Sequence, residues 1–145
     1  MGKQMIRFRA GWLIPQQILA LTHFHPQVTP EDFAGIAQAT QTALAQVTGE
    51  FHLILDNRII ADTNLATLAT MLQFMPQMNH PRLRWIVMIL PEVLRGTALT
   101  LPDQQYNQIH LTHVDTLPDA FKFLRSVDET IVWDKQNTDF FTPEA

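Results

Sequence analysis

The sequence has no cysteine, and its only serine is Ser126. The absence of cysteine excludes disulfides, thiol nucleophiles and thiolate metal sites, and it is compatible with a reducing cytosol. A single serine near the end of a predicted helix excludes a Ser-His-Asp triad of the usual kind. The five glycines are dispersed, so no glycine-rich phosphate loop is present. These absences remove the commonest nucleophile and nucleotide-binding chemistries.

Positive charge and long apolar runs are also scarce. The net charge is −4 and the basic residues are scattered, which argues against a nucleic-acid partner. The longest apolar run, Trp85 to Leu90, is far shorter than the roughly 20 residues that cross a bilayer. The first residues contain no apolar core or cleavage site of a signal peptide. With 46% hydrophobic residues in 145 positions, the chain is expected to be one soluble, cytoplasmic domain without a membrane span.

The segment from Phe51 to Leu72 organises the rest of the chain. An apolar run, FHLIL, ends on Asp56, and an apolar-periodic stretch begins after Asp62, Thr63 and Asn64. This pattern predicts a buried strand, a loop at its carboxyl end and a helix whose N-terminus faces that loop. In open α/β sheets this edge is where ligands and partners usually bind.

Similar patterns place the other elements. Strands are expected at 5–10, 18–24, 83–90 and 108–114, with a hairpin near Pro15 between the first two and an edge strand at 130–133. Helices are expected after the N-cap pattern TPED at Thr29, at 63–75, in a short turn at 91–96, and after TLPD at Thr116. Residues 97–105 are expected to form a surface loop. The result is an α/β domain over residues 1–134, with a mixed sheet of about five strands and three to four helices, followed by a C-terminal tail at 135–145.

Several short motifs in this order resemble the STAS family, especially its SpoIIAA-like branch. The helix opener VTPEDFAGI follows a strand, the strand LILD leads into DTNLATL, and the apolar strand WIVMIL precedes the final motif HVDTLPDAFKFL. The match covers about residues 18–124. The resemblance implies a STAS-like fold and a non-enzymatic role in protein–protein association, such as bacterial signalling, with no cofactor.

The same resemblance implies a phosphorylation site at the start of the helix after LILD. Thr63 occupies the position of the phosphoacceptor. Asn64 replaces the second hydroxyl, the motif's glycine is missing and the preceding loop is short, as suits the SpoIIAA-like branch, whose members often lack the motif. A phosphate there would gain from the helix N-terminus, whereas the plain alternative is that Asp62 or Thr63 caps the helix. The predicted partner-binding edge comprises Asp56, Asn57, Asp62, Asn64, Met71 and Met75.

Metal and enzyme hypotheses find little support in the residue spacing. His23 and His25 share one face of a strand, whereas His110 and His113 lie on opposite faces, and neither pair has zinc-site spacing. We therefore expect ordinary strand or surface histidines. The carboxylates of Asp56, Asp62 and Asp115 could form an acidic set at the sheet edge, but each also suits a loop or cap, and no nucleophile–base pair accompanies them. We expect no enzyme activity and no metal.

Apolar side chains suggest two further possibilities. Met71, Met75 and Met78 share one helical face, which is typical of core packing but could also form an adaptable surface for a partner or a second copy of the chain. Trp133, Phe140 and Phe141 could dock on a neighbour in the same way. The main alternative function is a carrier that holds a small apolar or lipid-like ligand between a helix and the sheet.

Overall fold

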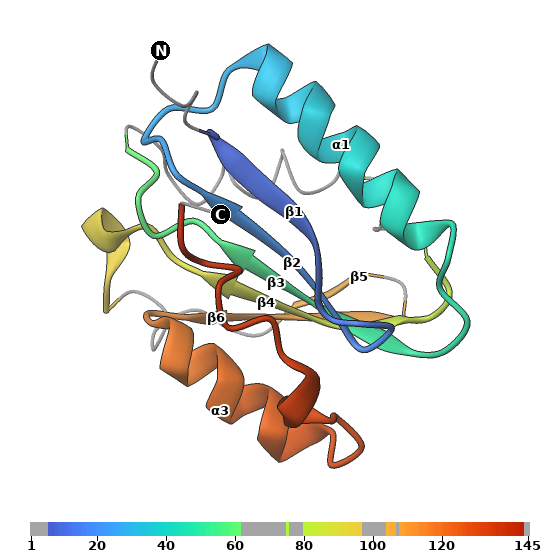
Figure 1. Ribbon diagram of the computed structural model, residues 1–145. Helices are drawn as coiled ribbons and strands as arrows, with labels where there is room; N and C mark the ends of the chain where they lie inside the picture. Colours follow the sequence, from blue (N-terminus) through green and yellow to red (C-terminus); the bar gives the residue numbers. More distant parts are fainter. Residues whose placement is uncertain (1–5, 62–74, 76–79, 97–103, 107, 144–145) are drawn as a thin grey trace.

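A six-stranded sheet of order β1-β2-β3-β4-β6-β5 forms the centre of the chain, with α1 on one face and α3 on the other (Figure 1). The computed structural model describes residues 6–61, 75, 80–96, 104–106 and 108–143. The regular elements are β1 (Phe8–Ile14), β2 (Ile18–His23), α1 (Pro30–Leu44), β3 (Phe51–Asp56), β4 (Leu83–Ile89), β5 (Gln104–Tyr106), β6 (Ile109–Val114) and α3 (Leu117–Val127). Short 3-10 turns span Glu92–Leu94 (η2) and Trp133–Lys135 (η4).

The sheet is mixed, as expected for this order of elements. β1 and β2 form an antiparallel hairpin. The strands β2, β3, β4 and β6 run parallel to one another, and β5 is antiparallel to β6. The α/β class is therefore confirmed. β5 is a correction, because residues 104 and 105 were expected in a surface loop. Two α-helices lie in the described part of the chain, fewer than the three to four expected; the helix predicted at 63–75 falls outside it except for Met75.

β1 extends further than its residue pattern indicates. The strand was expected to end at Ala10, but it continues through Gly11 to Ile14 because those residues pair with β2, for example Gly11 with Ala20. The hairpin turn follows at Pro15, as predicted, and Gln16 adopts a positive φ of 67° there. Cross-strand pairing has overridden the local signal of Gly11.

The start of α1 is determined locally. Thr29 accepts a hydrogen bond from the backbone N–H of Asp32 at 3.0 Å, and the Asp32 carboxylate accepts one from the Thr29 N–H at 3.1 Å. This capping box confirms the predicted N-cap. Arg7, directly before β1, donates to the same carboxylate at 2.9 Å. A side chain at Gly35 would lie 2.8 Å from the Phe8 ring, so glycine allows the helix to approach β1 closely.

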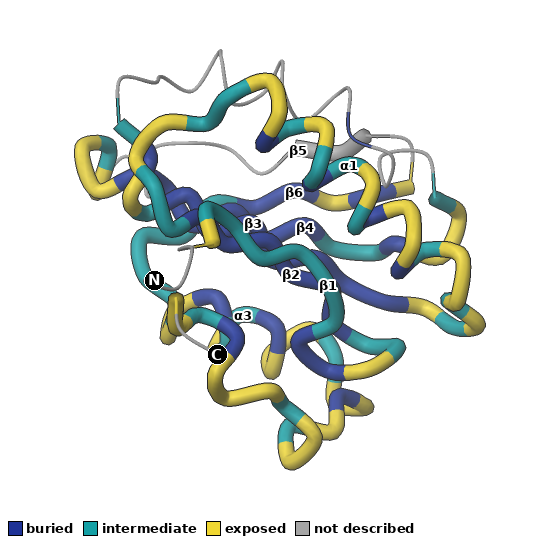
Figure 2. Tube along the Cα trace, turned by 45° about the horizontal axis from the view of Figure 1, so that its top comes forward, coloured by how far each residue is buried: buried dark blue, intermediate teal, exposed yellow. Residues whose placement is uncertain are grey.

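Each face of the sheet carries its own apolar core. The cluster under α1 includes Leu53 and Leu55 of β3, and the cluster under α3 includes Ile54 of the same strand. All residues of β3 are buried, so the strand lies in the middle of the domain (Figure 2). In the described part of the chain, no helix is long and apolar enough to cross a membrane.

The segment after α3 differs from expectation. Residues 130–133 form no strand; instead, the backbone N–H of Val132 donates to the side chain of Gln17 at 2.7 Å. Phe140 is only 2% exposed and belongs to the core under α3. Asn137 donates a backbone hydrogen bond to Leu13 of β1 at 2.8 Å. Residues 136–143, expected to lie in a tail, thus pack against their own sheet.

Candidate binding edge at the carboxyl ends of β2 and β3

The last residues of β2 and β3 form a polar pair at the edge of the sheet. Thr22 lies opposite Asp56 in the parallel register. Side chains alternate along a strand, so both residues continue the face that carries α3, after Ala20 and Ile54. The Thr22 hydroxyl donates to Asp56 Oδ2 at 2.8 Å. The Asp56 side chain is only 3% exposed, so the carboxylate needs internal partners.

Arg58 supplies most of these partners. Its Nε donates to Oδ1 of Asp56 and its Nη2 to Oδ2, both at 2.8 Å, which is a bidentate ion pair. The backbone N–H of Arg58 donates to Oδ1 as well, at 3.2 Å. Hydrogen bonding to Asp56 raises the pKa of Arg58, outweighing its partial burial. With the bond from Thr22, the carboxylate accepts four hydrogen bonds, which fills its acceptor positions.

Asn57 and His23 support this edge from the α1 side. Asn57 is 7% exposed, and its backbone N–H donates to Ile89 of β4 at 3.1 Å. His23 is 9% exposed. Burial lowers its pKa below the ordinary 6.5, although the carboxylates of Asp56 and Asp32 and a side-chain hydrogen bond with Asn57 act in the opposite direction. His23 is therefore neutral near pH 7.

A pocket of about 260 Å³ opens beside the ion pair. Its lining residues come from the ends of β2 and β3, from the loop after β3 and from the C-terminal segment: Thr22, His23, Phe24, Asp56, Arg58, Ile59, Phe141 and Pro143. The Arg58 side chain is 32% exposed, and Ile59 is 42% exposed. The pocket thus lies between the buried Asp56 carboxylate and an accessible, partly apolar rim.

Arg9 holds the C-terminal wall of the pocket. Its Nη1 donates to the backbone carbonyls of Asp139, Phe140 and Thr142 at 2.8, 2.7 and 2.9 Å. The guanidinium also lies over the Phe24 ring, 5.5 Å from its centroid. One side chain of β1 therefore fixes the segment that places Phe141 and Pro143 at the pocket.

The residues predicted for the binding edge lie in different parts of the structure or outside its described residues. Asp56 and Asn57 are at the edge, but both are buried and serve as its internal support. Met75 is 9% exposed and belongs to the core under α1. The candidates Asp62, Thr63, Asn64 and Met71 lie outside the residues that the structure describes. The functional surface was expected around residues 56–68, which includes Arg58 and Ile59, but neither residue was named for it. The spacing Asp-x-Arg at a strand end was the available signal for the arginine.

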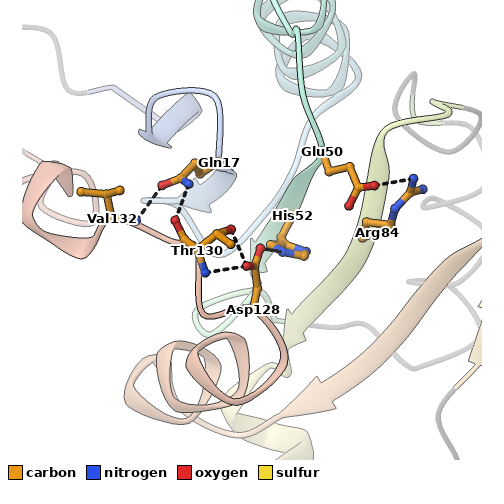
Figure 3. A network of polar contacts seen from close by, with 7 residues as sticks. All are labelled: Gln17, Glu50, His52, Arg84, Asp128, Thr130 and Val132. Carbon is orange, nitrogen blue, oxygen red and sulfur yellow. Dashed lines mark hydrogen bonds and ion pairs between the residues drawn. The ribbon is translucent and has the colours of Figure 1, made fainter.

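A second polar cluster lies at the opposite end of β3 (Figure 3). His52 Nε2 is 2.8 Å from Asp128 Oδ2, just after α3. The Thr130 hydroxyl donates to Asp128, and the Gln17 side chain bonds the backbone of Thr130 and Val132. Although burial raises the pKa of Asp128, hydrogen bonds from Thr130 and His52 outweigh it and lower that pKa. Because the hydroxyl is bonded to the carboxylate and not to His52, the cluster lacks a nucleophile–base pair and fastens the end of α3 to the sheet.

The other sequence candidates do not converge on a site. His110 stacks on Trp85 with ring centroids 4.7 Å apart, near the amino end of β4. His25 accepts a bond from the backbone N–H of Gln27 at 3.2 Å in the loop before α1. Among the described residues, no group of three or more histidine or acidic side chains is arranged to hold a metal ion.

Comparisons of the chain with protein-family models, curated proteins and solved structures find no match.

Proposed function

We propose that this chain is a non-enzymatic, cytoplasmic protein-interaction domain of the STAS type, similar to the SpoIIAA-like branch. Its binding surface is the edge where β2 and β3 end, together with the rim formed by Arg58 and Ile59. The order of strands and helices in the described part of the chain is compatible with this proposal. The family assignment itself rests on the short sequence motifs from VTPEDFAGI to HVDTLPDAFKFL.

The proposal rests on two neighbouring features: an ion pair whose carboxylate has all its acceptor positions filled, and an accessible apolar rim. The Asp56 carboxylate accepts four hydrogen bonds, so it has no acceptor position left to take a proton from a substrate. The pair therefore supports a rigid edge better than it supports catalysis. Ile59, at 42% exposure, is an apolar side chain placed directly at the pocket. A pre-formed pocket with an apolar rim is a suitable anchor point for a protein partner.

The carrier alternative receives less support from this pocket. A carrier needs an enclosed apolar cavity of roughly 300 Å³ or more between a helix and the sheet. The observed pocket of about 260 Å³ lies at the sheet edge, and the polar side chains of Thr22, Asp56 and Arg58 contribute to its lining. An apolar ligand there would leave part of its surface against charged groups.

Phosphorylation of Thr63 and homodimer formation are parts of the same proposal. Thr63 would follow the binding edge by only a few residues, so a phosphate there could control access to it. Mass spectrometry after treatment with a cognate kinase tests the modification, and a chain unmodified at Thr63 would remove the switch. Sedimentation equilibrium tests the dimer, since a mass equal to that of one 16.6 kDa chain would contradict it.

A matched pair of charge substitutions tests the partner-binding role. Ile59→Glu places a charge at the pocket, and Val132→Glu places one at a residue of similar exposure, 44% against 42%, outside the pocket lining. Both variants and the natural chain are used as baits in extract of the source cells. We expect a discrete protein that the natural chain and Val132→Glu retain and that Ile59→Glu loses. Equal retention by all three baits would contradict binding at this edge.

A further inference from the structure

We propose that residues 137–143 are exchanged between two copies of the chain, so that each copy supplies part of the binding edge of the other. We call this segment the plug. In the closed chain it packs against its own sheet (Figure 1, red). The inference rests on the homodimer of the proposed function and names the contact that forms it.

The shape of the plug is set by its own hydrogen bonds. The side chain of Asn137 accepts a hydrogen bond from the backbone N–H of Asp139 at 3.1 Å. The N–H of Phe140 donates to the carbonyl of Asn137 at 3.2 Å, and the N–H of Thr142 donates to that of Asp139 at 3.0 Å. These are turns that a short segment encodes by itself. The plug therefore brings the same shape to its own copy and to a second one, which lowers the entropic cost of binding.

The plug is held by contacts that any copy can offer. Nη1 of Arg9 donates to three of its backbone carbonyls at 2.7 to 2.9 Å. The backbone N–H of Asn137 donates to the carbonyl of Leu13 at 2.8 Å. The Phe140 ring, 2% exposed, fills a place in the core under α3. Because none of these contacts depends on which copy supplies the plug, exchange preserves all of them.

The chain before the plug is anchored independently. The Gln17 side chain binds the carbonyl of Thr130 and the N–H of Val132. The Arg125 guanidinium lies 4.5 Å from the centroid of the Trp133 ring. The 3-10 turn η4 ends at Lys135, so only Gln136 joins it to the plug. The plug can therefore leave its site while α3 stays in place.

This short connection determines how two copies can meet. One residue spans only a few ångströms, so the two plug sites must face each other across a two-fold axis. The site lies at an open side of the described sheet, because β1 is the last strand in its order. Residues 137–139 and 142–143 are exposed, so the plug leaves outward. Its charge also suits the site, since its one ionisable side chain is Asp139 and the site presents Arg9.

Exchange would make the binding edge a shared structure. Phe141 and Pro143 of the plug line the pocket together with Arg58 and Ile59. In the exchanged dimer these two residues come from the second copy. Binding of a partner at the edge and seating of the plug are then coupled, and each favours the other.

Protein concentration decides between the closed and the exchanged form. A tethered segment competes for its own site with an effective concentration of the order of 1 mM. The closed chain therefore predominates in dilute solution, and the exchanged dimer should form with a Kd of about 1 mM. Lengthening the connection should favour the closed form, since short hinges favour exchange.

A mixture of ¹³C-labelled and unlabelled natural chain tests the exchange. The two are unfolded together in urea, refolded and studied at about 1 mM by isotope-filtered NOE spectroscopy. The rings of Phe121 and Phe141 lie with centroids 6.3 Å apart. We expect cross-peaks between Phe121 of the labelled copy and Phe141 of the unlabelled copy. Closed chains keep this contact within one copy and give no such cross-peaks.

A longer connection provides the second measurement. Six glycine and serine residues are inserted between Gln136 and Asn137. At the concentration where half of the natural chain is dimeric, sedimentation equilibrium should show this variant as a monomer. A variant that is as dimeric as the natural chain would contradict exchange.

The outcomes separate this inference from the proposed function. A dimer without the cross-peaks between copies overturns the inference and leaves the proposed homodimer standing. A natural chain that is monomeric at about 1 mM overturns both, while the baits still decide the partner-binding role of Ile59. If the cross-peaks appear but no protein depends on Ile59, the inference stands and partner binding at the edge fails.

Discussion

Removing Arg58 should destabilise the domain strongly, and removing Asp56 as well should restore much of the loss. In Arg58→Met, the buried Asp56 carboxylate loses two of its four hydrogen bonds and its counter-charge. Breaking a buried ion pair from one side typically costs about 3–5 kcal/mol. The lower end applies here, because the carboxylate keeps the bonds from Thr22 and from the backbone of residue 58. We therefore expect a loss of about 3 kcal/mol.

Removing the charge of Asp56 should cost less. In Asp56→Asn, the guanidinium of Arg58 can turn to water, since its side chain is already 32% exposed. We expect a loss of about 1–2 kcal/mol, mainly from weaker hydrogen bonds. In the double variant neither charge remains buried, so the loss should be about 2 kcal/mol and not the sum of the two single losses.

Urea unfolding at pH 7 of the four chains measures this coupling. The midpoints give the free energies of unfolding if the slope m is the same for all chains. Ile59→Ala serves as a control next to the pair, and its stability should change by no more than about 0.5 kcal/mol because its side chain is accessible. The loss in the double variant is compared with the sum of the two single losses. If the two agree to within about 0.5 kcal/mol, Asp56 and Arg58 do not act as a pair, and the ion pair is not what supports the edge.

Three further predictions concern other parts of the fold. Phe140→Ala should cost about 3–5 kcal/mol in urea unfolding, because the ring is 2% exposed; a loss below about 1 kcal/mol would show that the C-terminal segment is not part of the core. Thr29→Ala should cost about 1 kcal/mol, since it removes the N-cap of α1; Thr42→Ala, on the exposed side of the same helix, is the control, and equal losses would contradict the cap. Burial lowers the pKa of His23 below 6.5, so the unfolded chain takes up this proton first, and stability should fall as the pH drops below about 6.5. His23→Asn should flatten that part of the pH curve, and an unchanged slope would refute the burial argument.

The sequence predicted the elements whose signals are local. The N-cap of α1 follows from Thr29, Pro30 and Asp32, which lie next to one another, and the capping box forms as expected. The apolar runs that became β3 and β4 are similarly self-contained. In each case, neighbouring residues carry most of the information that determines the structure.

Elements that depend on distant residues were not predictable in this way. The position of residues 136–143 depends on Arg9, some 130 positions earlier in the chain. The predicted strand at 130–133 did not form, because the side chain of Gln17 bonds this backbone instead. Such contacts have no local pattern in the sequence.

In the candidate site, too, the residues with local signals were predicted and those that depend on distant contacts were not. Asp56 was expected at the carboxyl end of a buried strand, and it lies there. Its pairing with Arg58 was missed despite the spacing Asp-x-Arg at the strand end, since an arginine in a loop usually extends into water. The apolar wall at Phe141 was missed because it depends on the folding of the C-terminal segment back onto the sheet.

Photo-cross-linking from position 59 tests the central claim most directly. A benzophenone amino acid replaces Ile59 in one chain and Val132 in another, and both are irradiated in the source cells. The account predicts a discrete cross-link to another protein from position 59 and none to that protein from position 132. Identical cross-links from both positions, or none from position 59, would contradict a binding edge at the carboxyl ends of β2 and β3.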